Sequence, residues 1–284
     1  MASLSSIEFQ LFKKYIHDQC GIDLNEDKAY LIETRLSKLL IDSGLSTFEA
    51  LYQTLKNNRD PHIATRVIDA MTTNETLWFR DMSPWVIMVD KLLPRYIEEL
   101  RAKKRSRVRI WSAAASTGQE AYSTVMCIND YLIKNRIDDI RLSDFEIVAT
   151  DISQNVLEIA RRGHYDNISI MRGLETTFRD RYFTKSGAVW ELKEEIRNQV
   201  RFEQFNLQNS FLFLGRFDVV FCRYVLIYFS DVLKKDIFEK IVRVLNPEGT
   251  LIIGASELYV EMDRFFARQN YLNGTYYALK GDKI

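Results

Sequence analysis

The hydrophobic period of the sequence changes part-way along the chain, and this change limits the possible folds more than any other feature. From Ser5 to about Met71 the apolar residues recur every three or four positions, as in Phe9, Phe12 and Ile16, which is the spacing of an amphipathic helix. Turn and cap residues interrupt this pattern at Gly21 and Asn25, at Gly44 and Thr47, and at Asp60-Pro61. We therefore predict four short helices in this part of the chain.

After Arg107 the pattern changes to short runs rich in valine, isoleucine and phenylalanine, separated by segments of helix length. These runs are residues 107–112, 144–151, 199–206, 217–223, 249–256 and 274–280. Such alternation predicts an α/β domain with a mostly parallel sheet that helices cover on both faces. Because ligands of such sheets bind beyond the carboxyl ends of the strands, functional residues should cluster there.

Residues 163–200 are not required by this alternation. A Lys185-Ser186-Gly187 turn lies between two short apolar stretches at their centre, which predicts a small β-hairpin insert. We therefore expect an all-helical N-terminal domain over residues 1–75 and a sheet domain over residues 76–284, with the insert at about residues 165–200.

Charge and cysteine content exclude several classes of protein. The 39 Lys and Arg residues balance the 39 Asp and Glu residues, so no overall field draws the chain to nucleic acid or to an anionic membrane. The segment 101–109 carries six basic residues and could contact nucleic acid or an acidic partner, although a solvated helix end is the favoured interpretation. No secretory signal and no apolar run of about 18 residues occurs. The scattered cysteines and histidines predict no metal site, and we expect a cytoplasmic monomer without nucleic acid partner or membrane insertion.

Two strand ends favour a nucleoside ligand. The first strand runs into WSAAASTGQEAYS, residues 111–123, where small side chains allow close backbone approach and the start of the following helix presents free N–H groups. This turn has neither the Walker A nor the GxGxxG pattern, and tight packing alone would also explain it. The second strand ends at Asp151, which could accept hydrogen bonds from both ribose hydroxyls or could cap the next helix.

The junction of the two halves carries polar residues among apolar ones. In MTTNETLWFR, residues 71–80, the polar side chains include Asn74, Thr76 and Arg80. An arginine can hold the carboxylate of a free amino acid group, and neutral oxygens can hold its ammonium. A polar interdomain linker would have the same composition, so both interpretations stay open.

The predicted strand at 217–223 runs into Arg223, Tyr224 and Tyr228. Aromatic residues at this strand end could stack on a base or line a channel to a reacting group. Tyrosines at helical spacing are more often core residues, and this alternative also stays open.

Taken together, several blocks resemble, in order and spacing, the CheR-type chemotaxis protein methyltransferases: MTTNETLWFRD, WSAAASTGQEAYS, ATDIS with LEIARRGHY, FDVVFCRYVLIYF and LNPEGTLIIGASE. The similarity covers essentially the whole chain, and the first and fourth blocks are specific to this family. The resemblance implies a class I, Rossmann-like methyltransferase domain with an all-helical N-terminal domain and a small inserted β-subdomain. It also implies S-adenosylmethionine as methyl donor, S-adenosylhomocysteine as product, and glutamate side chains of bacterial chemoreceptors as acceptors.

The resemblance assigns these positions to the donor site: Asn74, Thr76, Arg80, Glu120, Asp151, Asn206, Leu207, Arg223 and Tyr224. The first three match contacts to the methionine end, Asp151 matches the ribose ligand, and the 206–207 pair matches adenine-side contacts. Arg223 and Tyr224 fall at a pair that is usually Arg-Asn in the family, which puts a side-chain amide contact at position 224 in doubt. Gln119 and Ala121 replace the usual Glu and Pro around Glu120 and leave its carboxylate in place.

For the acceptor, we hypothesise that Tyr228 and Arg223 orient the incoming glutamate. That carboxylate is already ionised at neutral pH, so the reaction needs no general base.

Docking of the substrate is assigned to the second predicted helix. Lys28, Arg35 and Lys38 are spaced at i, i+7 and i+10, so they would share one face and could meet acidic residues on the helical bundle of a chemoreceptor. The compact 185–187 turn favours a member that does not bind a receptor tail peptide. The enzyme would be recruited from the cytoplasm to chemoreceptor arrays.

Two other functions are kept as alternatives. The first is a methyltransferase of RNA or of a small molecule. An RNA methyltransferase should show a basic face across its cleft. A non-catalytic signalling module would bind the cofactor or its product without turnover, which the unusual Tyr224 makes conceivable.

Overall fold

The computed structural model describes residues 3–257 and 259–280. Its N-terminal part consists of α1 (Ser6–Cys20), the 3-10 turn η1 (Glu26–Lys28), α2 (Ala29–Asp42), α3 (Phe48–Lys56) and α4 (Pro61–Met71). The apolar faces of these helices meet in a core of their own, which includes Phe12, Leu36 and Val67. The prediction of four amphipathic helices is therefore confirmed.

Local side-chain chemistry sets the ends of these helices. Ser5 and Glu8 form a reciprocal capping box at the start of α1. The Thr47 hydroxyl accepts a hydrogen bond from the N–H of Ala50 at 3.1 Å at the start of α3. Gly21 ends α1 with φ of 76°, a left-handed conformation that glycine adopts without strain.

The second domain is built on a seven-stranded sheet in the order β6-β2-β1-β7-β8-β10-β9. Its strands are β1 (Val108–Ala113), β2 (Phe145–Asp151), β6 (Val200–Gln204), β7 (Phe217–Cys222), β8 (Leu245–Ile253), β9 (Phe266–Tyr271) and β10 (Gly274–Leu279). The first five in sheet order run parallel, whereas β10 is antiparallel to both β8 and β9. The edge strand β9 was not predicted, because among its residues only Phe266 is fully buried and the rest carry no apolar alternation.

Residues of the central strands alternate between two cores, one on each face of the sheet. Ile110 and Val219 face the core formed with α5 (Ser83–Ile87), the π turn η2 (Met88–Leu92), α6 (Leu93–Arg101), α7 (Gln119–Lys134) and α8 (Gln154–Arg162). Trp111 and Val220 face the core formed with α12 (Asp231–Val244). Short 3-10 turns complete the domain: η3 (Leu142–Asp144), η4 (Leu212–Leu214), η5 (Leu226–Tyr228) and η6 (Val260–Arg264). The fold is the expected α/β, class I methyltransferase arrangement with helices on both faces.

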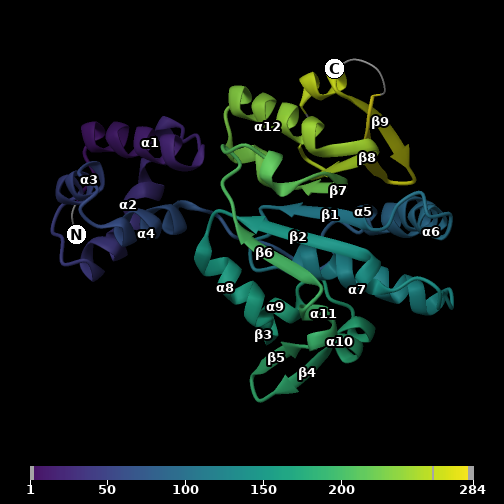
Figure 1. Ribbon diagram of the computed structural model, residues 1–284. Coiled ribbons are helices and arrows are strands. Elements are labelled where there is room, and N and C mark those ends of the chain that lie inside the picture. The colour runs from purple at the N-terminus through teal and green to yellow at the C-terminus, as the bar shows by residue number, and fades with distance from the viewer. Residues whose placement is uncertain (1–2, 258, 281–284) are drawn as a thin grey trace.

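The insert between β2 and β6 forms a small separate sheet in the order β3-β5-β4, below the main sheet in Figure 1. Its elements are β3 (His164–Asp166), α9 (Asn167–Met171), α10 (Thr176–Tyr182), β4 (Phe183–Ser186), β5 (Val189–Leu192) and α11 (Glu194–Arg197). The hairpin predicted around the 185–187 turn is β4–β5, in which Ser186 pairs with Val189. The third strand, β3, was not predicted, since three residues give no periodic signal.

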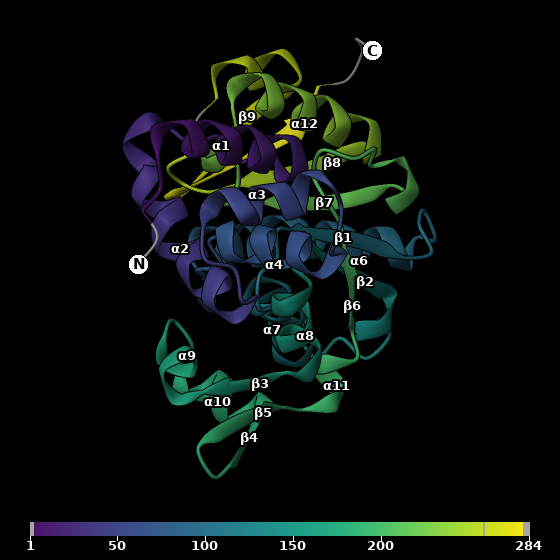
Figure 2. The ribbon, with the colours of Figure 1, turned by 90° about the vertical axis from the view of Figure 1, so that its left-hand side faces the viewer.

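The helical domain lies opposite the carboxyl ends of the parallel strands (Figures 1 and 2). Backbone and side-chain contacts join the two parts: the N–H of Asp23 donates to the carbonyl of Tyr228 at 2.8 Å, and Ile22 forms an isolated bridge with Phe229. Any ligand beyond these strand ends therefore meets both domains. No helix in the described ranges is long and apolar enough to cross a membrane.

Candidate active site

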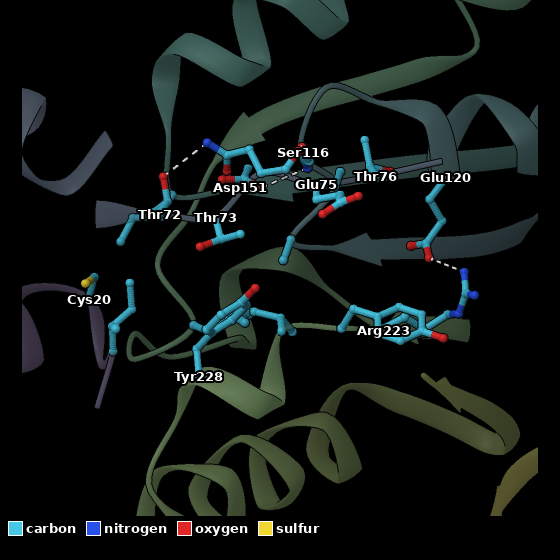
Figure 3. A pocket seen from close by; sticks show the side chains of 18 of the residues that line it. Cys20, Thr72, Thr73, Glu75, Thr76, Ser116, Glu120, Asp151, Arg223 and Tyr228 are labelled. Atoms are coloured by element: carbon cyan, nitrogen blue, oxygen red, sulfur yellow. Dashed lines mark hydrogen bonds and ion pairs between the residues drawn. The ribbon is translucent and has the colours of Figure 1, made fainter. Parts of the chain in front are cut away.

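A pocket lies where the helical domain meets the carboxyl ends of β1, β2, β6 and β7 (Figure 3). Its empty volume is about 940 Å³, which includes the open mouth. The positions that the sequence assigned to the donor and the acceptor all line it: Asn74, Thr76, Arg80, Glu120, Asp151, Asn206, Leu207, Arg223, Tyr224 and Tyr228. The parallel sheet thus brings together residues that are far apart in the chain.

Asp151 ends β2 and is only 6% exposed. Its two carboxylate oxygens accept the backbone N–H groups of Ser116 at 2.8 Å and of Ser153 at 2.9 Å. Burial raises the pKa of Asp151, although these hydrogen bonds oppose the shift. The cap of α8 is Ser153, whose hydroxyl accepts from the N–H of Val156. Asp151 is therefore not the helix cap, and both of its oxygens retain lone pairs for ligand hydroxyls.

Glu120, Arg223 and Asp81 form a charged cluster at one end of the pocket, and Arg223 is the buried member. Glu120 accepts from the Ser112 hydroxyl at 2.7 Å and from Arg223 Nη1 at 2.8 Å. Arg223 Nη2 donates to Asp81 Oδ2 at 2.9 Å and to the carbonyl of Arg80 at 2.7 Å. Burial alone would lower the pKa of Arg223, but the charges of Glu120 and Asp81 outweigh it and raise that pKa.

This arrangement argues against the hypothesis that Arg223 orients the acceptor carboxylate. Both Nη atoms of Arg223 already bind protein oxygens, and its side chain is 2% exposed. Its Nε atom is buried and has no hydrogen-bond partner within the described part of the chain. These contacts hold Glu120 and Asp81 in place, and a role of Arg223 toward the acceptor stays a prediction.

The guanidinium of Arg80 lies over the ring of Tyr224, with its carbon 3.4 Å from the ring centroid. Its Nη1 donates weakly to the carbonyl of Glu75 at 3.4 Å, and no carboxylate pairs with it among residues 3–257 and 259–280. The Tyr224 hydroxyl donates to Asp81. Burial, and then Asp81, raise the pKa of Tyr224, so the hydroxyl stays protonated. Arg80 is thus a half-buried cation that can accept an anionic ligand.

The interdomain linker and the turn after β6 form two further walls. The Ser116 hydroxyl donates to the carbonyl of Asn74 at 2.8 Å, which fixes the linker against the turn after β1. Asn206 Nδ2 donates to the carbonyl of Gln19 at 2.8 Å, so this amide joins the sheet domain to α1. Leu207 is buried beside it. An adenine contact at these positions stays a prediction.

Tyr228 lies in η5, directly after β7, and points into the cavity across from Asp151 (Figure 3). Its ring packs partly against both domain cores. Its hydroxyl makes no hydrogen bond to any residue that the structure describes, so it is available to a ligand.

The residues predicted to dock the substrate are only partly arranged as expected. Lys28 is the last residue of η1 rather than part of α2, and Lys38 is exposed on α2. Arg35 does not belong to a free basic surface, because its Nη1 donates to the carbonyl of Met71 at 2.7 Å and its Nη2 to the Thr73 hydroxyl at 3.0 Å. Arg35 instead holds the end of α4 and the start of the linker.

Several pocket residues were missed in the sequence. Cys20 and Ile22, at the end of α1, line the pocket, as does Ser116. Asp81 does not line the pocket but contacts its residues Arg223 and Tyr224. It stands directly after Arg80 and lies within the first family block, but its partner Arg223 is 142 positions away. Sequence reasoning could have weighed Asp81 as a polar residue in that block, whereas Cys20 and Ile22 carry no recognisable signal.

The basic segment 101–109 offers little free positive charge. Arg105 pairs with Glu99 and Asp218, and Arg109 pairs with Glu146. These internal pairs support its interpretation as the end of α6 leading into β1. Within the described ranges, no group of three or more histidine, cysteine or acidic residues could hold a metal ion.

Two family models cover almost the whole chain. Residues 7–72 match the CheR methyltransferase all-alpha domain, and residues 74–272 match the CheR methyltransferase SAM-binding domain. The chain belongs to the CheR methyltransferase family. It is 42% identical to chemotaxis protein methyltransferase Cher2 of Pseudomonas putida, over 90% of this chain and 91% of that protein. It is 39% identical to a chemotaxis protein methyltransferase of Vibrio parahaemolyticus, over 98% of each chain.

The CheR pocket fits S-adenosylmethionine in the chemistry of its lining groups. The carboxylate of Asp151 suits ribose hydroxyls, Glu120 suits an ammonium, and the unpaired Arg80 suits a carboxylate. Cys20, Ile22, Leu207 and Phe229 add an apolar wall for a purine ring.

Among solved structures, a DhpI–SAH complex matches with a TM-score of 0.30 and 17% identity, over 72% of each chain.

Proposed function

We propose that this CheR-family enzyme methylates glutamate side chains on the cytoplasmic helical bundle of bacterial chemoreceptors. The observation that carries the proposal is the pocket itself, in which an unpaired cation, the carboxylates of Glu120 and Asp151 and an unbonded tyrosine hydroxyl face one cavity at the domain junction. Family membership supplies the cofactor and the chemotactic setting.

When bound, S-adenosylmethionine supplies a methyl group on a sulfonium, so a carboxylate oxygen forms the new bond to carbon while the carbon–sulfur bond breaks and its electron pair stays on sulfur. No proton needs to move, because a glutamate with a pKa of about 4.3 is ionised at neutral pH. The protein therefore contributes mainly by holding the reactants and by keeping water out. Such orientation can supply roughly 7–11 kcal/mol.

We assign the following tasks to the residues of the chain. Asp151 accepts the ribose hydroxyls, Glu120 faces the ammonium, and Arg80 holds the carboxylate of the amino acid end of the donor. Tyr228 is the candidate to orient the acceptor carboxylate, because its hydroxyl has no other partner in the described chain. Arg223 supports this set by holding Glu120 and Asp81 in place.

Docking is assigned to the exposed Lys38 on α2, together with Lys28. We expect the enzyme to act as a monomer at the cytoplasmic face of chemoreceptor arrays. We also expect it not to bind a receptor tail peptide, because only residues 187 and 188 connect β4 to β5. Binding of such a peptide at micromolar affinity would overturn that expectation.

The deciding experiment incubates the purified chain with methyl-labelled donor and chemoreceptor membranes. The proposal predicts label on the receptor band that mild base releases as methanol, as expected for a glutamyl methyl ester. A receptor whose acceptor glutamates are replaced by alanine serves as control and should stay unlabelled. Label on RNA or on a small molecule, or donor binding without transfer, would instead support one of the two alternatives.

A further inference from the structure

Tyr224 adopts a backbone conformation that is unusual for its side chain. Its φ is 58°, in the left-handed region that large side chains rarely adopt. The conformation is held by a hydrogen bond from the N–H of Tyr224 to Glu257 at 2.5 Å, and buried Glu257 also accepts from the N–H of Gly254 at 2.9 Å. Such an outlier persists only where the surroundings enforce it, and it often marks a functional position.

The ring of Tyr224 is close to both Gly254 and Arg80. A methyl group at Gly254 would stand 3.1 Å from a ring carbon of Tyr224, so the absence of a side chain there makes room for the ring. The guanidinium of Arg80 lies over the ring, 3.4 Å from its centroid. The hydroxyl of Tyr224 donates to Asp81 and so fixes the ring in its plane.

We propose that Tyr224 is a positioning residue for the donor, whose ring holds Arg80 in the orientation that binds a carboxylate. The inference rests on the proposed role of Arg80. An asparagine, the usual family residue here, would adopt the left-handed conformation with less strain but would offer no aromatic face to Arg80. With tyrosine at position 224, the protein lacks the side-chain amide of asparagine but gains an aromatic ring that holds Arg80 in one orientation.

The expected effect follows from what Arg80 would lose. Without the ring, the long Arg80 side chain samples several rotamers in the free protein, and ligand binding must order it. The strength of a partly buried cation–π contact corresponds to about 5- to 30-fold in a dissociation constant. This loss should appear only for ligands that reach Arg80.

The test measures binding by isothermal titration on the full-length chain with two probes. S-adenosylhomocysteine carries the amino acid carboxylate, and methylthioadenosine lacks it. Tyr224→Leu should weaken S-adenosylhomocysteine binding about 5- to 30-fold and change methylthioadenosine binding less than about 2-fold. Tyr224→Phe, which keeps the ring, should stay within about 3-fold of the parent for both probes.

Two controls separate this role from a general structural one. Tyr271 also lies under a cation, Lys91 at 4.1 Å from its ring, and donates to Asp90, but it is distant from the pocket. Tyr271→Leu removes the same kinds of contact and should change neither affinity. In an Arg80→Ala background, Tyr224→Leu should have no further effect on S-adenosylhomocysteine binding.

Three results would overturn the inference. The first is an equal loss for both probes in Tyr224→Leu, and the second is an additive loss in the double variant. The third is tighter S-adenosylhomocysteine binding by Tyr224→Asn than by Tyr224→Phe, since position 224 would then act through its backbone. If Arg80→Ala retained full affinity, the assignment of Arg80 and this inference would both fail, while receptor labelling would test the proposed function separately.

Discussion

Replacing Arg223 by leucine tests whether this residue mainly neutralises Glu120 and Asp81 within the protein. The arginine side chain is 2% exposed, and its two partners are 13% and 24% exposed at their side chains. The substitution removes the cation that Glu120 and Asp81 share and leaves both carboxylates without it. It also removes the hydrogen bond to the carbonyl of Arg80.

The magnitude follows from the burial of the cluster. Breaking a buried ion pair costs about 3–5 kcal/mol, because the remaining charge is left without compensation. The partial exposure of Asp81 lowers this figure, so we expect a loss of about 3 kcal/mol in the free energy of unfolding. Adding Glu120→Gln should recover part of the loss, since an amide needs no cation.

Urea unfolding followed by tryptophan fluorescence measures this loss in the relevant domain. The four tryptophans are Trp78, Trp85, Trp111 and Trp190, and all lie beyond the helical domain. The matched control is Arg101→Leu, which breaks an exposed ion pair in which Arg101 donates two hydrogen bonds to Asp139. This substitution should lower the free energy of unfolding much less.

An unchanged free energy of unfolding for Arg223→Leu would refute this reasoning. So would a loss of acceptor turnover with normal stability and normal S-adenosylhomocysteine affinity, because Arg223 would then act on the acceptor as first hypothesised.

The remaining predictions concern the other pocket and surface residues. Burial raises the pKa of Asp151, so it takes up a proton at a higher pH than an exposed aspartate. S-adenosylhomocysteine affinity should therefore fall as the pH is lowered through that range; titration calorimetry at several pH values measures this, and a flat profile would exclude Asp151 as ribose ligand. Tyr228→Phe should reduce turnover at least about 10-fold with little change in cofactor affinity, and titration showing the reverse would reject its role. Lys38→Glu should raise the KM for receptor membranes and leave S-adenosylhomocysteine binding unchanged, whereas Lys56→Glu on α3 should do neither.

The pocket could be predicted largely because its residues stand directly after strands. Asp151 and Arg223 each follow a run of buried β-branched or aromatic residues, and the parallel arrangement brings such ends to one edge. The helices were also predictable, since both their apolar spacing and their caps are local features. Both the strand ends and the helices can thus be predicted from neighbouring residues, within about one helical turn or one strand.

What could not be predicted depends on partners that are distant in the chain. The Arg223 hypothesis was incomplete because its counter-ions Glu120 and Asp81 are 103 and 142 positions away. The contact between the Tyr224 ring and Arg80 could not be predicted from the sequence for the same reason. The edge strand β9 was missed for a different reason: its pairing with β10 is mostly backbone hydrogen bonding, which needs no apolar pattern.

Arg35 shows how the helical domain takes part in the pocket as well as in docking. It was predicted as a docking cation, but it binds the carbonyl of Met71 and the hydroxyl of Thr73, and Thr73 lines the pocket. Ile22, two residues after the end of α1, reaches the same cavity and pairs with Phe229. Because α2 carries both the exposed Lys38 and this internal contact, the surface proposed to receive the receptor and the wall of the donor pocket belong to one packed helical unit. The packing at the domain junction therefore sets the position of the proposed acceptor site relative to the proposed donor site.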